Sequence, residues 1–516
     1  MRHDQDEPDR SPAGGMSGRR RTIRALIWSS AGTGVAFASN ILAMIWLSRV
    51  LGPRIVGTSA AVLAICNIFR ATLLLPIVQA TVTEQGQTAA FARAAGRLST
   101  AVGLGGFAAL AAGGYGASLT LDAPFLAQLS AVAGASVAVA AAGGRSFAVL
   151  QRALRFRTLS IFQACGAALG SLVAAPVVAY SSFSALALVV GALVAASVEC
   201  LGAMWASRGA RSRSDTGDGT SVATVARASS GLVAVGFSSS VALQGDTLVV
   251  AATLGPGPAG LYSRAYRLMA LPANLLGDVA DAVLLSAGAQ ATLQRLRRAF
   301  ESASLLILIL TWPIGLVCAV LAEDLVRVLL GEEWMGSVPV LRVLCLALPF
   351  RVAYKGPAII LKSRRRSWAL TQRLAVYAAL VVTLASAGAG LGLVWVGVGV
   401  AASVMTFYVL ISVAVSNELA VPLRVWSDNA LAAALALPGA LTALVVSQAT
   451  QPWHAWARLA TCGALSVGVL AVTWFLVWRS SAGRLSDVRA WWSEQSALGD
   501  RVQPTAESAT VESAPG

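Results

Sequence analysis

Two arginines near the middle of the chain have a spacing that could hold an anion. Arg264 and Arg267 are three residues apart, so a helix would place them on one face, beside Tyr262 and Tyr266. A planar guanidinium can pair with phosphate oxygens through two parallel hydrogen bonds. The pattern predicts an anion-binding site. The alternative is that both arginines reach to the outer interface or cap the preceding loop.

Further cations lie inside long apolar stretches, where a charge is costly and is therefore a functional candidate by default. These cations are Arg70, Arg342, Arg351 and Lys355. Arg351 and Lys355 are four residues apart, which also predicts one helix face. A cavity lined mainly by cations would suit an anionic substrate. The alternative is internal ion pairing, in which Asp278 and Asp281, three residues apart on a predicted helix, could pair with any of these cations.

Asp246 is an isolated carboxylate within an apolar stretch, two residues after Gln244. It is predicted to bind a coupling cation, Na⁺ or H⁺, or to pair with an arginine of the cavity. The alternative is a polar residue buried in helix packing.

The residues suited to covalent or metal chemistry are few and scattered. The two histidines are His3, in a polar segment, and His454, in a short loop. The six cysteines lie in apolar stretches and include no C-x-x-C pair. We therefore expect no catalytic residue, no metal site and no cofactor other than a coupling ion.

The composition is that of a membrane protein. Only 12% of the 516 residues are charged and 56% are hydrophobic, whereas soluble domains carry about 25% charged residues. Apolar runs of about 20 residues, the length that spans a bilayer, predict about 14 transmembrane helices. The predicted helices cover 25–48, 57–80, 98–119, 125–144, 160–180, 182–206, 229–253, 261–287, 302–322, 337–360, 369–389, 391–415, 428–449 and 456–478.

The net charge of +15 is better explained by topology than by a nucleic-acid partner. Arginines gather in every second loop, which predicts that both termini and the loops near Arg155, Arg211 and Arg365 are cytoplasmic. The basic loops are also expected to attract anionic membrane lipids. Tryptophans near the ends of the predicted spans suggest an interfacial belt. They are Trp28, Trp46, Trp312, Trp334, Trp368, Trp453, Trp474 and Trp478.

A phrase of the form L-G-P-x-x-x-G occurs twice, at Leu51–Gly57 and at Leu254–Gly260, and residues 150–160 are echoed at 361–371. Internal repeats of this kind are typical of transporters. They predict two six-helix lobes in a parallel pseudo-two-fold arrangement, followed by two extra helices. The predicted divisions are a disordered cytoplasmic tail at 1–18, an N-lobe at 19–222, a C-lobe at 223–416, the extra helices at 417–480 and a cytoplasmic tail at 481–516.

The segment Leu254–Pro272, which contains G-L-Y-S-R-A-Y-R-L, resembles the bacterial polysaccharide-transport family. Its members are lipid-linked oligosaccharide flippases of the multidrug/oligosaccharidyl-lipid/polysaccharide exporter superfamily. Weaker matches are Leu51–Gly57, Leu150–Arg157 and Leu329–Trp334. One departure is Arg70–Pro76, where members often carry an acidic residue and glycine, and it leaves the substrate open.

The resemblance implies a polytopic helical bundle of the plasma membrane that works by alternating access. It implies a polyprenyl-diphosphate-linked oligosaccharide as substrate, moved from the cytoplasmic to the outer leaflet. Glycosyltransferases or a polymerase of the same pathway would be partners. Two alternatives remain: a multidrug exporter of the same fold, and a membrane-embedded glycan polymerase or ligase. The short outer loops disfavour the enzyme.

Overall fold

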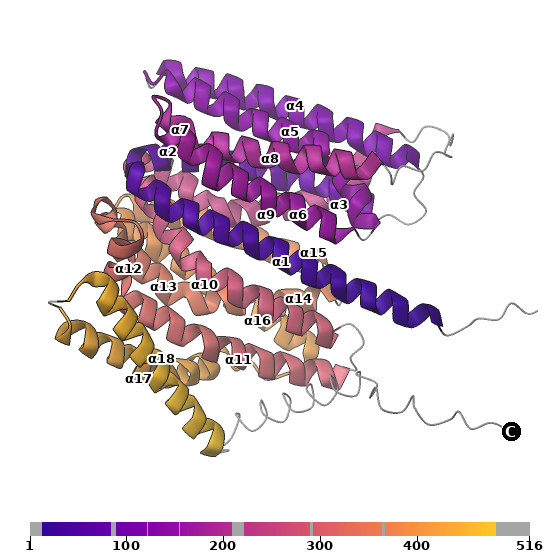
Figure 1. Ribbon diagram of the computed structural model, residues 1–516. Coiled ribbons are helices and arrows are strands. Elements are labelled where there is room, and N and C mark those ends of the chain that lie inside the picture. Colours follow the sequence, from indigo (N-terminus) through magenta and orange to yellow (C-terminus); the bar gives the residue numbers. More distant parts are fainter. Residues whose placement is uncertain are drawn as a thin grey trace, which may run out of the picture. The chain divides into compact units, whose positions relative to one another are not determined.

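The computed structural model describes residues 13–83, 89–120, 122–153, 155–208, 221–288, 293–363, 367–451 and 453–480. Within these ranges every regular element is a helix and there is no strand (Figure 1). The predicted tail at 481–516 and residues 1–12 of the predicted tail at 1–18 lie outside the described ranges. The predicted all-α architecture is confirmed.

The described residues of the first half of the chain form nine α-helices, two of which are continued by a π-helical turn. In chain order the elements are α1 (Ala13–Val50), α2 (Pro53–Phe69), the π-turn η1 (Arg70–Leu74), α3 (Leu75–Thr83), α4 (Ala89–Thr120), α5 (Phe125–Arg152), α6 (Phe156–Ala168), the π-turn η2 (Leu169–Ala174), α7 (Ala175–Ala179), the 3₁₀ turn η3 (Ser184–Leu186), α8 (Ala187–Ser207) and α9 (Val222–Thr253).

The second half continues in the same way. Its elements are α10 (Pro256–Gly288), α11 (Leu293–Val320), α12 (Ala322–Leu329), the 3₁₀ turn η5 (Glu332–Ser337), α13 (Val338–Ala353), α14 (Lys355–Ser363), α15 (Ser367–Ala389), α16 (Leu393–Leu419), α17 (Val425–Ala449) and α18 (Ala455–Ser480).

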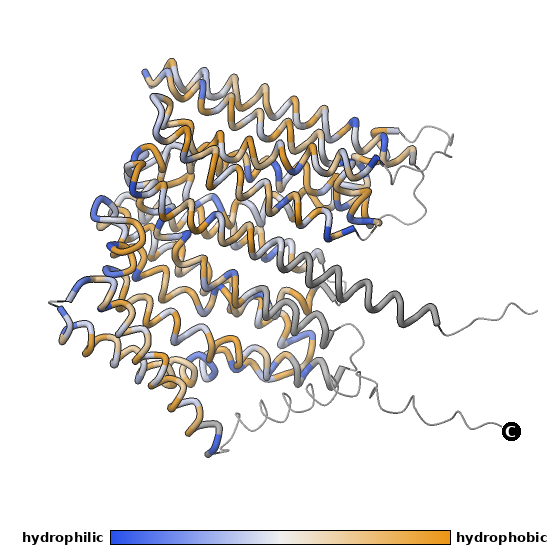
Figure 2. Tube along the Cα trace, in the orientation of Figure 1, coloured by the Kyte–Doolittle hydropathy of each residue, from blue (hydrophilic) through white to orange (hydrophobic). Residues whose placement is uncertain are grey.

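Each of the 14 predicted apolar segments coincides with a helix or with a pair of consecutive helices. Thirteen stretches of the described residues are long and apolar enough to cross a membrane, and α10, which carries Arg264 and Arg267, is not among them. Figure 2 shows the apolar residues running along the helices and the hydrophilic ones concentrated near their ends. The chain is therefore a multi-pass membrane protein.

The helix starts follow from proline and glycine. Pro53 and Pro256 stand at the first position of α2 and α10, where a missing N–H costs nothing. Gly255 before α10 has a φ of 90°, a conformation that residues with side chains rarely adopt. The two copies of the L-G-P phrase therefore end one helix and start the next, as the repeat predicts.

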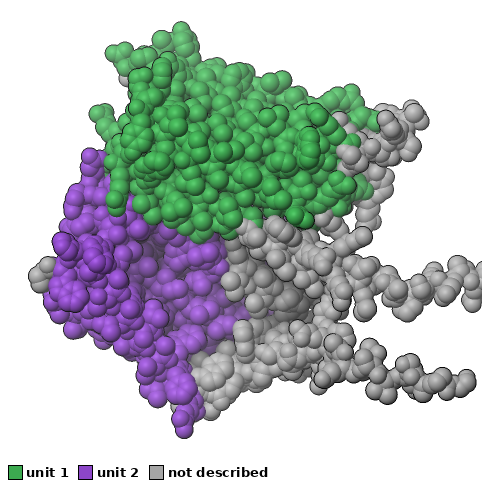
Figure 3. All heavy atoms as spheres, in the orientation of Figure 1, with its two compact units in different colours: residues 1–263 green, residues 264–516 purple. Residues whose placement is uncertain are grey.

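The helices group into two compact units, residues 1–263 and 264–516, shown separately coloured in Figure 3. In unit 1, α5 packs against α4 and α8, and α6 packs against α1 and α8. In unit 2, α11 packs against α13 and α17, α15 packs against α16, and α17 packs against α18. The lobe boundary at 222, which rests on the repeats, and the parallel arrangement of the lobes stay predictions.

Within unit 1 the two L-G-P-x-x-x-G phrases lie against each other. A side-chain carbon on Gly57 would stand 1.8 Å from the carbonyl oxygen of Pro256, and one on Gly260 would stand 1.9 Å from that of Pro53. Both distances are far below van der Waals contact, so only glycine fits at either position. The contact is reciprocal: Gly57 of the first phrase packs against the carbonyl of Pro256 in the second, and Gly260 of the second packs against the carbonyl of Pro53 in the first.

Candidate functional site

Arg264 is the most deeply buried cation of the predicted site. Its side chain is 1% exposed and its Cζ lies 5.6 Å from the ring centre of Trp334, which is itself fully buried in η5. Its Nε and Nη2 are buried and have no hydrogen-bond partner among the described residues. Stacking on the indole stabilises the buried guanidinium by about 2 kcal/mol when the pair is desolvated. This is less than the desolvation penalty of a buried charge, which is several kcal/mol. The guanidinium is therefore a buried cation whose Nε and Nη2 are unsatisfied among the described residues.

Two more of the predicted cations belong to other helices and contact α10, the helix that carries Arg264. Arg351 of α13 stacks on Tyr266 of α10, with its Cζ 4.6 Å from the ring centre. Lys355, the first residue of α14, lies against α10 further along, where a side-chain carbon on Gly277 would stand only 1.9 Å from its Nζ. A side chain at position 277 would therefore displace the ammonium from its position against the backbone of α10. Unit 2 thus gathers Arg264, Arg351 and Lys355 along α10.

Arg267 shares α10 with Arg264 but not its environment. Arg267 is exposed, whereas Arg264 is buried. The three-residue spacing places the two side chains about 60° apart around the helix axis, enough to separate a packed position from an open one. Asp278 and Asp281, the predicted partners of these cations, have side chains outside the described set.

Arg342 lies apart from these cations, in a pocket of mixed charge. Its guanidinium is half exposed and 4.0 Å from the carboxylate of Glu323. The pocket has a volume of about 630 Å³, and Asp324, Arg327 and Arg458 also line it. Arg342 therefore faces acidic neighbours as well as basic ones, which does not match a purely cationic cavity.

A buried ion pair beside this pocket joins α12 to α18. The Nε of Arg458 lies 2.9 Å from both carboxylate oxygens of Asp324, and Nη2 also contacts one of them. The side chains are only 12% and 6% exposed. The pair ties the last described helix, α18, to the rest of unit 2.

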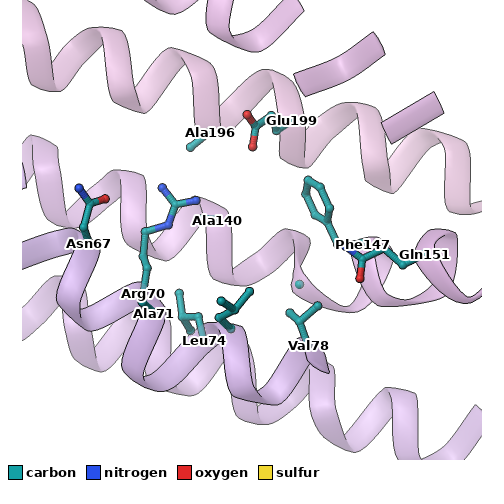
Figure 4. Close-up of a pocket in the computed structure, with 12 residues that line it drawn as sticks. Asn67, Arg70, Ala71, Leu74, Val78, Ala140, Phe147, Gln151, Ala196 and Glu199 are labelled. Atoms are coloured by element: carbon teal, nitrogen blue, oxygen red, sulfur yellow. The ribbon is translucent and has the colours of Figure 1, made fainter. Parts of the chain in front are cut away.

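Arg70 lines a different cavity, in unit 1, where it begins the π-turn η1. The cavity has a volume of about 400 Å³ and also holds the carboxylate of Glu199, from α8 (Figure 4). Glu199 is not among the residues predicted from the sequence. The signal that identifies Arg70, an ionisable residue inside an apolar span, applies equally to Glu199.

Asp246 is 1% exposed and fully engaged with hydroxyl and amide donors of unit 1. The hydroxyl of Tyr262 donates to its Oδ2 at 2.7 Å, and the backbone N–H of Thr247 donates to its Oδ1 at 2.7 Å. Among the described residues, no group of three or more acidic, histidine or cysteine side chains comes together. A cation at Asp246 would have to complete its coordination with hydroxyl and backbone oxygens.

The predicted tryptophan belt needs one correction. Trp46, Trp368 and Trp453 are 43%, 70% and 51% exposed, as a belt requires. Trp334 is fully buried, because its ring packs over Arg264 inside unit 2. It belongs to the candidate site and not to the membrane interface.

Comparison with known sequences identifies the family. Residues 46–339, more than half of the chain, match the family described as polysaccharide biosynthesis protein, and the chain belongs to this family. The chain is also 34% identical over 102 residues to the lipopolysaccharide biosynthesis protein WzxC of Escherichia coli (strain K12). That match spans 19% of this chain and 21% of WzxC.

Comparison with solved structures identifies the fold. The lipid II flippase MurJ, in an inward closed conformation, superposes with a TM-score of 0.71 over 88% of this chain and 99% of its own, at 12% identity. An inward-facing multidrug resistance transporter of the MATE family, MOP superfamily, gives a TM-score of 0.58 over 77% of this chain and 98% of its own, at 14% identity. The protein therefore has the fold shared by these flippases and exporters.

Proposed function

We propose that the protein is a flippase that moves a polyprenyl-diphosphate-linked oligosaccharide from the cytoplasmic to the outer leaflet of the bacterial plasma membrane, with both termini in the cytoplasm. Membership of the polysaccharide biosynthesis family and the fold shared with a lipid II flippase support this proposal. The observation that carries it is Arg264, a buried guanidinium with two nitrogens that have no hydrogen-bond partner among the described residues.

The diphosphate is the part of such a substrate that most needs the protein. It must leave water to cross the bilayer, and charge-assisted hydrogen bonds to guanidinium groups replace part of its hydration. Arg264 stacks on Trp334 and Arg351 stacks on Tyr266, so an aromatic ring covers one face of each guanidinium, whose planar edge carries the N–H groups that can pair with phosphate. Arg267 and Lys355 add positive charge along the same helix.

No covalent step is required, so the proposal assigns no enzymatic activity. The lobes would alternate between inward and outward access, and a cation, Na⁺ or H⁺, bound at Asp246 would couple the cycle to an ion gradient. Glycosyltransferases would supply the lipid-linked glycan on the cytoplasmic side, and a polymerase or ligase would consume it outside.

The test measures transport by proteoliposomes that contain the full chain and the lipid-linked glycan isolated from the source cells. A membrane-impermeant lectin would report the glycan that reaches the opposite leaflet. Arg264→Gln is expected to lower the initial rate by about tenfold or more, the equivalent of one charged hydrogen bond. Arg264→Lys should recover only part of the rate, because an ammonium lacks the planar fork.

Arg227→Gln is the matched control, since Arg227 is an exposed residue of α9 that no other observation links to the substrate. It should transport at the wild-type rate. Wild-type rates in both Arg264→Gln and Arg351→Ala would exclude the cationic site. Failure of the wild-type protein to move the glycan, together with efflux of cationic drugs from the same vesicles, would establish the multidrug exporter instead.

A further inference from the structure

The cavity of unit 1 contains a set of polar side chains that the diphosphate site does not use. Four polar groups face it, from four helical elements: Asn67 of α2, Arg70 of η1, Gln151 of α5 and Glu199 of α8. The remaining wall is apolar and includes Leu74, Val78 and the ring of Phe147. A volume of about 400 Å³ falls within the usual range of ligand pockets, about 300–1,000 Å³.

These four side chains make no hydrogen bond and no ion pair with any residue that the structure describes. Arg70 and Glu199 are a basic and an acidic residue in one apolar-walled cavity, yet their charged groups are more than 4.0 Å apart, since no salt bridge joins them. In Figure 4 the two side chains extend toward the cavity from opposite walls. Donors and acceptors are thus held apart, with room for a ligand between them.

The charges of the cavity limit the ligand's chemistry. A diphosphate would be attracted by Arg70 but repelled by the carboxylate of Glu199. An organic cation would be attracted by Glu199 but repelled by Arg70. A metal ion would find a single carboxylate, too few ligands for a stable site. A neutral ligand that bears several hydroxyl groups can donate to Glu199 and accept from Arg70 at once, and the amides of Asn67 and Gln151 do both.

We propose that this cavity is a sugar-binding subsite, which takes one pyranose ring of the glycan between Arg70 and Glu199. Phe147 offers an apolar surface for the C–H face of the ring. The inference rests on the proposed function for the source of the sugar. It also removes Arg70 from the set of diphosphate ligands and gives it a role in choosing the glycan.

The local backbone supports a functional role for Arg70. The π-turn that begins at Arg70 interrupts the regular helix between α2 and α3, and such turns are frequent at functional sites. The turn is packed tightly, because a side-chain carbon on Gly236 of α9 would lie 2.3 Å from the carbonyl oxygen of Ala71. The shifted register is therefore built into the packing of unit 1.

The test uses the purified full chain in lipid nanodiscs and measures saturation-transfer NMR with free methyl glycosides. The probes are methyl glucoside, methyl N-acetylglucosaminide and methyl glucuronide. At least one of them should bind the wild-type protein. Glu199→Gln, Arg70→Gln and Phe147→Ala should each weaken that binding by about tenfold, as expected for the loss of a charged hydrogen bond or of ring packing.

Two controls separate this cavity from the rest of the molecule. Glu333→Gln, which removes an exposed acidic charge of η5, should bind the glycoside as the wild type does. Arg351→Ala should also bind it normally, although the proposed function requires this variant to flip poorly. Inorganic pyrophosphate should not displace the glycoside.

Each contrary result has a defined meaning. The sugar subsite is overturned if no glycoside binds the wild type, if the three cavity variants bind as well as it does, or if pyrophosphate displaces the sugar in an Arg70-dependent manner. If the glycoside binds as expected but the proteoliposomes do not flip the glycan, the subsite stands and the flippase proposal fails. Addition of the isolated lipid-linked glycan tells the sources apart: displacement of the glycoside assigns the subsite to the transported substrate, and no displacement overturns that assignment.

Discussion

Single residues of this protein carry charge into places that exclude water, and their neighbours determine what the charge can do. Arg264 stacks on Trp334, and two of its nitrogens have no hydrogen-bond partner in the part of the chain that the structure describes. Asp246, in contrast, accepts hydrogen bonds from Tyr262 and Thr247. Residue type and apolar context were enough to single out both from the sequence. Their partners were not predictable, because Trp334 is 70 residues distant in sequence from Arg264 and its contact arises only in the folded unit.

Asp246 gives a residue-scale prediction about coupling. Asp246→Asn is expected to abolish the dependence of glycan flipping on an imposed Na⁺ or H⁺ gradient, because the amide retains the shape but not the charge that holds a cation. The measurement compares flipping in proteoliposomes with and without each gradient. Tyr262→Phe is the matched control, since it removes the hydrogen bond of 2.7 Å but leaves the carboxylate, and it should keep the gradient dependence. An Asn variant that responds to the gradient as the wild type does would assign Asp246 to helix packing.

At the scale of elements, each unit combines contacts between consecutive helices, such as α4 with α5 or α15 with α16, and contacts between helices distant in sequence, such as α1 with α6 or α11 with α17. The apolar runs predict where helices lie, because a bilayer fixes their length. The runs do not predict interruptions such as η1 and η2, since a π-turn changes backbone hydrogen bonding and not composition. They also do not reveal that Glu199 approaches the cavity of Arg70, which requires α8 to pack on α5.

The reciprocal glycine contact gives a prediction about packing. Gly57→Ala and Gly260→Ala should each lower the thermal midpoint of the purified protein, because a methyl group at 1.8 or 1.9 Å from a carbonyl oxygen forces α2 and α10 apart. The expected loss is about 1–3 kcal/mol. Gly105→Ala is the control, since nothing lies within 4 Å of its side-chain position, and it should be neutral or stabilising through helix propensity. Equal midpoints in all three variants would show that the helices accommodate the methyl group.

The ion pair of α12 and α18 gives a second packing prediction. Asp324→Asn should destabilise unit 2 by about 3–5 kcal/mol, because it leaves Arg458 buried without a counter-charge. The double variant Asp324→Leu with Arg458→Leu should recover most of that loss. Glu332→Gln, which removes the exposed partner of Arg327, should change stability by less than about 1 kcal/mol. Tryptophan fluorescence during thermal unfolding measures all of these, and a double variant no more stable than the single one would contradict the interpretation.

At the scale of the whole molecule, the apolar runs predict the positions of the helices, and the charges in the loops predict the side of the membrane on which each loop lies. The 14 predicted segments correspond to helices, and the fold matches that of MurJ with a TM-score of 0.71. This much was predictable because membrane insertion depends on local hydropathy and flanking charge. The arrangement of the lobes is not set by local hydropathy or flanking charge. Its prediction therefore depends on the internal repeats alone.

Topology gives the prediction that belongs to this scale. In a variant without the six native cysteines, single cysteines introduced near Arg155, Arg211 and Arg365 should be labelled only from the cytoplasmic side. Cysteines near Asp122, Glu332 and His454 should be labelled only from outside. The reason is the alternation of basic and acidic loops. Labelling of positions near 332 and 365 from the same side would require an even number of spans between them, in place of the single predicted span at 337–360, and a revised helix count in the second half.

The reciprocal contact of the L-G-P phrases also has a consequence for biogenesis. Gly57 leaves the ribosome about 200 residues before Pro256, its partner in the finished protein. At the roughly 5–20 residues per second of synthesis, the start of α2 waits on the order of 10–40 s for that partner. During this interval α2 is inserted, but its contact with Pro256 does not yet exist. The first seven predicted spans therefore complete their packing only after the eighth span begins to enter the membrane.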